Sequence, residues 1–287
     1  MPQNPRDIRR RIKSFQSTAQ ITKAMEMVAA AKLRRVQEAV QLSKPYLERL
    51  QSMLAEVSRS ARFVKHPLLA QRPVRRTGYL VVTADRGLAG AYNANVIRRT
   101  VQEIRGKDKG SYTIFAVGRR GRDYFARNGH PIGGEVTGLP DSPTYPHILP
   151  LAEKIIKAYG DEEFDELYLV YNEFINAVTQ VTVMKKVLPL ATHTDEGTAT
   201  GNTQYLYEPD EEAVLTEMLP KFAQTLVYQA ILDAKASEHG ARMTAMGNAT
   251  DAAKDMIDGL TLALNRARQA AITTQIAEVV GGAEALK

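Results

Sequence analysis

The feature that most constrains the fold is an apolar repeat in steps of three and four residues, which runs from Ile8 to Val57. Its positions are Ile8, Ile12, Phe15, Ala19, Thr22, Glu26, Ala29, Leu33, Val36, Val40, Ser43, Leu47, Leu50, Leu54 and Val57, and only Thr22, Glu26 and Ser43 interrupt its apolar character. Such length is typical of a coiled coil and not of an ordinary globular helix. We therefore predict a helix from about residue 6 to about residue 59, bent or weakened at Pro45, with a seam that needs a partner.

Short β-rich runs alternate with helical stretches through the middle of the chain. The runs that predict strands are 78–84, 111–118, 166–174 and 179–190, and the helical stretches are 94–104, 121–128 and 148–159. Residues 136–147 are expected to form a loop held open by Pro140, Pro143 and Pro146. Strands alternating with helices indicate a Rossmann-like α/β domain with a largely parallel sheet, which we assign to residues 61–209.

A second long helix is predicted for residues 210–287. Asp210, Glu211 and Glu212 are favourable at a helix start, and Pro220 is expected to break or restart the helix. Its predicted seam is Met246, Ala249, Ala253, Met256, Leu260, Ala263, Ala267 and Ala270. The expected fold class is therefore α+α/β. In it, residues 1–60 and 210–287 pair as an antiparallel two-helix coiled coil around the α/β insert.

The second helix is predicted to outrun its partner, because it is the longer at about 1.5 Å per residue. Apolar residues near its carboxyl end then lack cover from this chain and require another protein. These residues are Ile272, Ile276, Val279 and Val280. The alternative is that they form ordinary coiled-coil core.

Charge is unevenly distributed along a chain whose net charge is +6. Residues 1–60 carry twelve Lys or Arg against five Asp or Glu, whereas residues 210–287 carry seven against eleven. The two helices could simply attract each other, or the basic helix could face an acidic partner or nucleic acid.

The absence of cysteine excludes disulfides and thiol chemistry and fits the cytosol. The basic start lies inside the heptad pattern, so we expect no targeting peptide.

The motifs of common catalytic sites are missing. The sequence has no Walker A loop and no GxSxG elbow, and its five His are dispersed. We therefore predict no catalytic residue, no cofactor and no metal. The segment Thr83–Asn93 follows a strand and precedes a helix, where phosphate binds in doubly wound folds. Asp85 would repel phosphate, so a structural turn is favoured over a ligand site.

Three segments together resemble the gamma subunits of F-type ATP synthases. They are RDIRRRIKSFQSTAQITKAMEMVAAAKLRRVQ near the amino terminus, TADRGLAGAYN in the middle and NRARQAAITTQIAEVVGGAEAL near the carboxyl terminus. YLYEPD and ASEHGARMTAM also match, in the family's order. The departures are Ala89 for a common Cys, Gln275 for Glu, and Gly247 and Asp251 for Lys and Asn. The match spans the chain, and because no targeting peptide is expected, we predict a bacterial member of the family.

The resemblance implies a non-catalytic subunit of a proton-translocating complex. The coiled coil would be the central rotor shaft inside three alpha and three beta subunits, and the α/β domain would sit with the epsilon subunit against the c ring. The shaft would transmit torque between proton flow and ATP synthesis or hydrolysis, and impose asymmetry on the three catalytic sites. No nucleic acid is expected, and membrane contact would occur only through the c ring, at the cytoplasmic face of the bacterial cell membrane.

The resemblance also implies partner contacts for particular residues. Those expected to face the beta subunits are Arg9, Arg10, Arg34, Arg35, Arg75, Arg76, Arg268 and Gln269. Ile272, Ile276, Val279 and Val280 would turn in an apolar collar of alpha and beta. Tyr205, Tyr207 and Glu208 would lie near epsilon and the c ring, unless they merely dock the linker on the sheet. For each arginine the alternative is a solvated helix face.

Two other functions remain open from the sequence. A coiled-coil structural or nucleic-acid-binding protein with a Rossmann-like insert would explain the basic first helix, although the acidic second helix and the lack of interleaved aromatics oppose it. A nucleotide-binding enzyme could use the TADRGLAG segment.

Overall fold

The computed structural model describes residues 4–60, 66–190 and 210–284, which fall into two compact units. Residues 1–29 and 243–287 form the unit that we call the helical-pair unit, and residues 30–242 form the α/β unit. The long helices α1 (Pro5–Ser60) and α5 (Glu211–Glu284) contribute to both. The predicted boundaries near residues 60 and 209 adjoin undescribed residues and stay a prediction.

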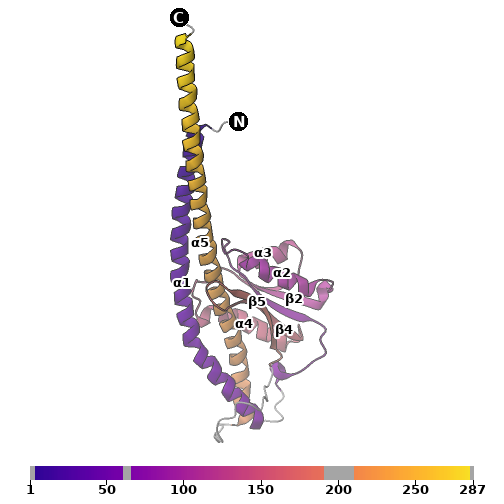
Figure 1. Cartoon of the computed structure of the whole chain (residues 1–287). Helices are drawn as coiled ribbons and strands as arrows, with labels where there is room; N and C mark the ends of the chain where they lie inside the picture. The colour runs from indigo at the N-terminus through magenta and orange to yellow at the C-terminus, as the bar shows by residue number, and fades with distance from the viewer. Residues whose placement is uncertain (1–3, 61–65, 191–209, 285–287) are drawn as a thin grey trace. The chain divides into compact units, whose positions relative to one another are not determined.

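In the helical-pair unit, α1 and α5 run antiparallel (Figure 1). Thr22 of α1 contacts Thr250 of α5, and Glu26 of α1 lies opposite Gly247 of α5. The contact thus moves forward along α1 while it moves backward along α5, as an antiparallel pair requires. Ile8, Ala29, Met246 and Ala253 are buried along this seam. Small residues at the contact let the two backbones approach closely, so shape as well as apolar area holds this pair together.

The seam predicted for α1 is confirmed along its length, because each of its positions is buried or half-buried. The seam predicted for α5 is wrong at Met256, which is 57% exposed, and at Ala270, which is also exposed, while Thr250 is buried. Ile257 is half-buried in its place. Met256 and Ile257 both fit steps of three and four, so the pattern alone could not choose between them. The rotation of α5 about its own axis relative to α1 determines which of the two residues faces the seam.

The α/β unit contains a five-stranded sheet in the order β3-β2-β1-β4-β5. The strands are β1 (Thr77–Val82), β2 (Tyr112–Val117), β3 (Ile132–Val136), β4 (Glu166–Phe174) and β5 (Gln180–Leu188). The first four strands in this order are parallel, and β5 is antiparallel to β4. The predicted α+α/β class with a largely parallel sheet is confirmed.

Alternate residues of each strand pack on opposite faces of the sheet. On one face, Tyr79 and Val81 pack with α2 (Tyr92–Ile104) and α3 (Arg119–Arg127). On the other, Leu80 and Val82 pack with α4 (Tyr145–Gly160), the last turns of α1 and the first part of α5. Because successive side chains of a strand point to opposite faces of the sheet, one set of strands supplies side chains to both cores. Two short 3-10 helices, η1 (Pro67–Leu69) and η2 (Lys109–Ser111), complete the described elements.

Strand β3 was missed by the sequence prediction. Its sequence is IGGEV, and glycine disfavours strands. The neighbouring strand β2 explains the glycines, because a Cβ on Gly133 would lie 2.7 Å from Thr113 Oγ1 and 3.2 Å from the Phe115 ring. Large side chains of β2 thus fill the space that side chains of β3 would need.

Two prolines behave differently from expectation. The predicted break at Pro220 is wrong, since α5 continues through it. Leu215 and Leu219 before it and Ala223 and Val227 after it are buried in one core, and their burial outweighs the missing hydrogen bond. Pro146 lies in the first turn of α4 and not in the preceding loop, because the first turn of a helix leaves backbone N–H groups without a partner in any case.

The predicted start of α5 is confirmed, with Ala213 N–H donating to Asp210 Oδ1 at 2.8 Å.

Candidate partner-binding surfaces

The polar groups of the Thr83–Asn93 loop hold the turn itself. Asp85 accepts hydrogen bonds from the N–H groups of Arg119 and Gly138, both at 3.0 Å. The Ala84 N–H donates to Asn93 Oδ1 at 2.8 Å, and the Gly121 N–H donates to Thr83 Oγ1 at 2.8 Å. These side chains are thereby engaged within the fold. The arrangement favours the structural turn over a phosphate site.

The same turn requires a glycine at position 118. Gly118 has a positive φ of 86°, and a Cβ there would lie 2.1 Å from the Thr83 carbonyl oxygen. Thr83 Oγ1 in turn donates to the Val117 carbonyl at 2.9 Å. The ends of β1 and β2 are therefore locked together by backbone contact at the edge where a doubly wound fold would place a ligand.

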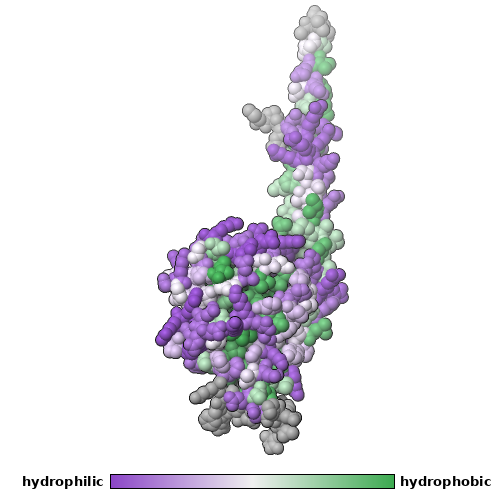
Figure 2. Space-filling view, turned by 180° about the vertical axis from the view of Figure 1, so that it is seen from behind, coloured by the Kyte–Doolittle hydropathy of each residue, from purple (hydrophilic) through white to green (hydrophobic). Residues whose placement is uncertain are grey.

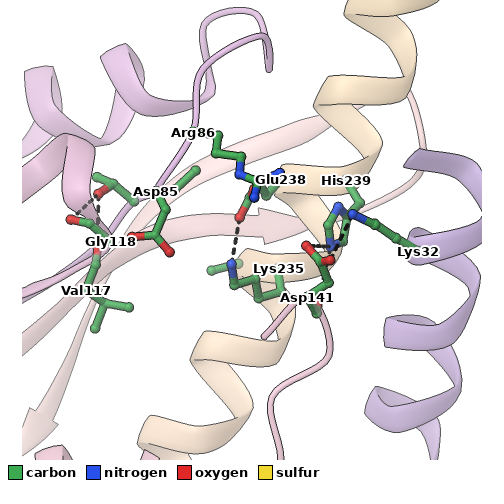
Figure 3. Close-up of polar contacts among 12 residues, drawn as sticks. Lys32, Asp85, Arg86, Val117, Gly118, Asp141, Lys235, Glu238 and His239 are labelled. Carbon is green, nitrogen blue, oxygen red and sulfur yellow. Dashed lines mark hydrogen bonds and ion pairs between the residues drawn. The ribbon is translucent and has the colours of Figure 1, made fainter. Parts of the chain in front are cut away.

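A buried ionic cluster lies on α5 within the α/β unit. Lys235 Nζ lies 3.0 Å from Glu238 Oε2 (Figure 3). Arg242 lies 2.8 Å from Glu238 Oε1. The side chains of Lys235 and Glu238 are only 8% and 6% exposed. Burial alone raises the pKa of the Glu238 carboxyl, but the charges of Lys235 and Arg242 outweigh it and hold that pKa below its usual range.

This cluster continues to the loop before α4 and to α1. Lys32 on α1 pairs with Asp141 at 2.8 Å, and His239 on α5 lies 3.9 Å from the same carboxylate. Figure 3 shows Lys32 and His239 converging on Asp141. Burial lowers the pKa of His239 below its usual value, so its ring is neutral at neutral pH. An ion pair thus joins the loop to α1, and the neutral His239 ring joins the same loop to α5, with Nε2 3.3 Å from the Asp141 carbonyl oxygen.

Sequence reasoning missed the role of these charges, since it counted them only toward the charge of each helix. The segment ASEHGARMTAM was a usable signal. With the preceding Lys235, it places Lys235, Glu238 and Arg242 at three- and four-residue spacings on one helix face. Gly240 within it lets the β4–β5 hairpin approach, because a Cβ there would lie 3.3 Å from the Phe174 ring.

The predicted basic residues are divided between the two units. Arg9, Arg10 and Arg268 lie in the helical-pair unit and are exposed, and Arg10 pairs with Asp7 at 3.3 Å. Gln269 is exposed beside Arg268. In the α/β unit Arg34 and Arg35 are exposed on α1, and Arg34 lies 3.9 Å from Glu38. Exposed pairs of this kind contribute little stability, typically under about 1 kcal/mol, which leaves these side chains available to a partner.

Arg75 and Arg76 are anchored through their backbone before β1. Both N–H groups donate to Asp165 Oδ2, at 2.7 and 3.0 Å. Burial alone would raise the pKa of Asp165, but these hydrogen bonds and the charges of Arg72 and Arg75 bring it below its usual value. The Arg75 side chain is exposed, whereas Arg76 is half-buried. Arg75 is therefore better placed than Arg76 to reach a partner.

The carboxyl-terminal part of α5 carries the apolar residues predicted to need cover. All residues from Arg268 to Ala283 are exposed, and Ala267 is the last half-buried one. Ile272, Ile276, Val279 and Val280 are 46%, 58%, 72% and 59% exposed. Figure 1 shows α5 continuing beyond the start of α1, and Figure 2 shows hydrophobic and hydrophilic residues interleaved there. Exposed apolar residues in this number mark a surface for another protein.

The remaining predictions concern the linker before α5, metal binding and membrane crossing. Tyr205, Tyr207 and Glu208 fall in 191–209, which the structure does not describe. Across residues 4–60, 66–190 and 210–284, no group of His, Asp and Glu could hold a metal ion. Within the same ranges no helix has the length and apolar character needed to cross a bilayer.

The fold and its surfaces define a class of protein. It has an antiparallel helical pair made from the two ends of one chain, an α/β insert whose turn residues are engaged structurally, and an apolar helix end that requires partners. A family model described as ATP synthase matches residues 4–286, so the chain belongs to the ATP synthase family. The resemblance to the gamma subunits is confirmed by a 51% identical relative, the ATP synthase gamma chain of Brevibacillus brevis, over 99% of each chain.

Solved structures support the fold. A chain from the central stalk and c-ring structure of Tetrahymena thermophila mitochondrial ATP synthase matches with a TM-score of 0.62 and 22% identity, over 80% of this chain and 99% of that one. A chain from the rotor of Euglena gracilis mitochondrial ATP synthase matches with a TM-score of 0.65 and 19% identity, over 93% and 98%.

Proposed function

We propose that this chain is the central rotor shaft, the gamma subunit, of an F-type ATP synthase. The observation that carries the proposal is its 51% identity with an ATP synthase gamma chain over 99% of both chains. In this role the chain is a non-catalytic subunit, and the alpha and beta subunits bind and convert the nucleotide. The engaged polar groups of the Thr83–Asn93 loop support this division of labour.

The proposed mechanism depends on the asymmetry of a two-helix shaft. Three catalytic sites surround the shaft, and one helical pair presents a different face to each of them. Each site therefore takes a different conformation and a different nucleotide affinity, which is a coupling free energy between separate sites. The close seam around Thr22, Ala29, Thr250 and Ala253 supports this role, since packed helices resist bending.

The exposed end of α5 supports the proposed bearing. Ile272, Ile276, Val279 and Val280 would turn in an apolar collar of alpha and beta subunits. Burial of apolar surface is non-directional, so such a contact has a weak angular preference and permits rotation.

Seven arginines and Gln269 are proposed to contact loops of the beta subunits, with Arg268 and Gln269 making polar contacts near the tip and the other arginines facing acidic loops. Arg9, Arg10, Arg34, Arg35, Arg75, Arg76, Arg268 and Gln269 are the residues in this set. Arg9, Arg10 and Arg35 are exposed on α1, where each guanidinium group can form bidentate hydrogen bonds with a carboxylate of a partner.

The remaining proposed partners are the epsilon subunit and the ring of c subunits, contacted through Tyr205, Tyr207 and Glu208. The complex would contain three alpha and three beta subunits per shaft. It would lie at the cytoplasmic face of the bacterial cell membrane, and the chain would meet the membrane only through the c ring.

The test is reconstitution of the full chain with alpha, beta and epsilon subunits. We expect co-purification as one complex and recovery of ATPase activity coupled to rotation, which is followed with a bead attached to the shaft. Failure to assemble would defeat the proposal. Salt-dependent retention on DNA by the chain alone would instead favour a nucleic-acid-binding protein, and saturable ATP binding by the chain alone would favour a nucleotide enzyme.

A further inference from the structure

An open groove of about 710 Å³ lies between α2 and α3 of the α/β unit. From α2 it is lined by Ile97, Arg98 and Val101, and from α3 by Arg120, Tyr124 and Arg127. Ile97 and Arg98 are adjacent and precede Val101 by four and three positions, and the residues of α3 are also three or four positions apart, so each helix presents one face to the groove. The opposite faces, with Val96 and Ile104 on α2 and Phe125 on α3, are buried against the sheet. The groove therefore lies on the outer side of this helical layer.

The groove is basic and its charges are uncompensated. Within the described residues, Arg98, Arg120 and Arg127 are exposed and none forms an ion pair. Neighbouring arginines differ, since Arg99 pairs with Glu103 at 3.9 Å and Arg122 pairs with Asp123 at 2.8 Å. Asp123 is the one acidic residue in the groove lining, and Arg122 already occupies it. Three guanidinium groups thus face one groove without a carboxylate of their own.

The groove is also partly apolar. Ile97 and Val101 are half-buried between the helices, and the Tyr124 ring is 37% exposed. Apolar residues between flanking arginines match an amphipathic ligand better than a compact anion, which would need charge alone. Two adjacent helices with regularly spaced side chains also offer the ridges against which a third helix packs.

We propose that the α2–α3 groove is a docking site for an acidic amphipathic helix of a partner protein. Its carboxylates would pair with Arg98, Arg120 and Arg127, each of which can bind a carboxylate through two N–H donors. Its apolar side chains would cover Ile97, Val101 and Tyr124. The proposal goes beyond the rotor assignment and does not depend on it.

The test uses a defined probe, a fluorescein-labelled synthetic helix with Glu on both flanks of a Leu stripe. Fluorescence anisotropy against the full chain should show saturable binding that weakens with salt. The Arg98→Glu/Arg127→Glu variant should weaken binding by more than about tenfold, because attraction becomes repulsion. Lys157→Glu is the matched control, since this exposed lysine lies on α4 at the other sheet face, and binding should not change.

A second measurement does not depend on charge reversal. The chain has no cysteine, so Ala94→Cys, at an exposed position of the groove, introduces a unique thiol. The probe helix should slow maleimide labelling of this thiol.

Three results would overturn the proposal. The first is equal binding by a peptide of the same composition with its Glu residues scattered, which would show mere charge attraction. The second is no protection of the introduced thiol. The third is saturable binding of tripolyphosphate with no binding of the helix, which would make the groove a small-anion site.

Discussion

The hydroxyl oxygens of Thr22 and Thr250 lie 2.7 Å apart across the seam of the helical-pair unit. Both residues are buried, at 9% and 4% exposure. Each hydroxyl also contacts a carbonyl one turn earlier in its own helix, at 3.0 Å for Thr22 and 2.9 Å for Thr250. A polar pair is thus satisfied inside a seam of small apolar residues, and it favours one register of the two helices.

Thr22→Val is expected to destabilise the helical-pair unit by about 1 kcal/mol, because the hydroxyl contact is lost without a change of shape. Thr22→Val/Thr250→Val should cost less than the sum of the single variants, since both polar groups are then removed. Urea unfolding of the three variants, followed by circular dichroism, measures the coupling. Strict additivity would show that the two hydroxyls do not interact.

Glu238→Gln is expected to destabilise the α/β unit by about 3 kcal/mol, because Lys235 is left buried without a counter-charge. Lys235→Met/Glu238→Leu should recover part of this loss, since the buried charge of Lys235 is removed together with its partner. The recovery is only partial, because Arg242, whose side chain is 13% exposed, also loses Glu238. Chemical unfolding of each variant gives the free energies. A double variant that is less stable than Glu238→Gln would contradict this account, and Glu217→Gln, on an exposed pair with Lys221, serves as control.

Asp233 gives a pH-dependent prediction. Burial, followed by repulsion from Glu173, raises the pKa of Asp233 from 3.8 to about 6. The folded state therefore holds this proton more tightly than the unfolded state, so the group favours the fold below about pH 4 relative to pH 7. Stability contributed by the protonated form is lost as pH rises toward the folded-state pKa of about 6.

Asp233→Asn should consequently stabilise the chain at pH 7.5 by about 1–2 kcal/mol, allowing for partial solvent screening. The gain should vanish near pH 4. Urea unfolding at both pH values measures it, with exposed Asp251→Asn as a control that changes little. An equal gain at both pH values would mean that the titration of Asp233 is not its source.

Glycines in α5 should respond according to their surroundings. A Cβ on Gly259 would have no neighbour within 4 Å, and one on Gly247 would have its nearest neighbour at 3.7 Å. Gly259→Ala and Gly247→Ala should therefore stabilise the isolated chain by up to about 1 kcal/mol each. Gly240→Ala should give less, because of the Phe174 ring at 3.3 Å. Thermal unfolding ranks the three, and the reverse order would refute the packing argument.

Charge reversal tests the proposed contacts with the beta subunits. The triple variant Arg9→Glu, Arg10→Glu and Arg75→Glu should lower ATPase activity and proton pumping of the reconstituted complex, because attraction to acidic loops becomes repulsion. The unfolding midpoint of the free chain should stay unchanged, since all three side chains are exposed. Reversal of Arg105, Lys109 and Lys157 is the matched control. Unchanged hydrolysis and pumping in the first variant would exclude these residues as contacts.

Local patterns in the sequence determined the long helix α1, its seam and three of the parallel strands. A helix or strand buries one face at a fixed period, so a repeated apolar spacing is visible without knowledge of the partner. The start of α5 at Asp210 was predictable for a similar reason, because its side chain caps the helix locally. The exposed apolar end of α5 also followed from the unequal lengths of the two helices.

Tertiary structure alone decided the remaining features. Strand β3 exists because Phe115 and Thr113 of β2 occupy the space above its glycines, and α5 passes Pro220 because residues on both sides are buried in one core. The choice of Ile257 over Met256 for the seam depends on how α5 is rotated against α1. Likewise, Asp141 meets Lys32 and His239 only through folding. Each of these features is stabilised by contacts between residues far apart in the sequence, and the spacing of residues within one segment cannot predict such contacts.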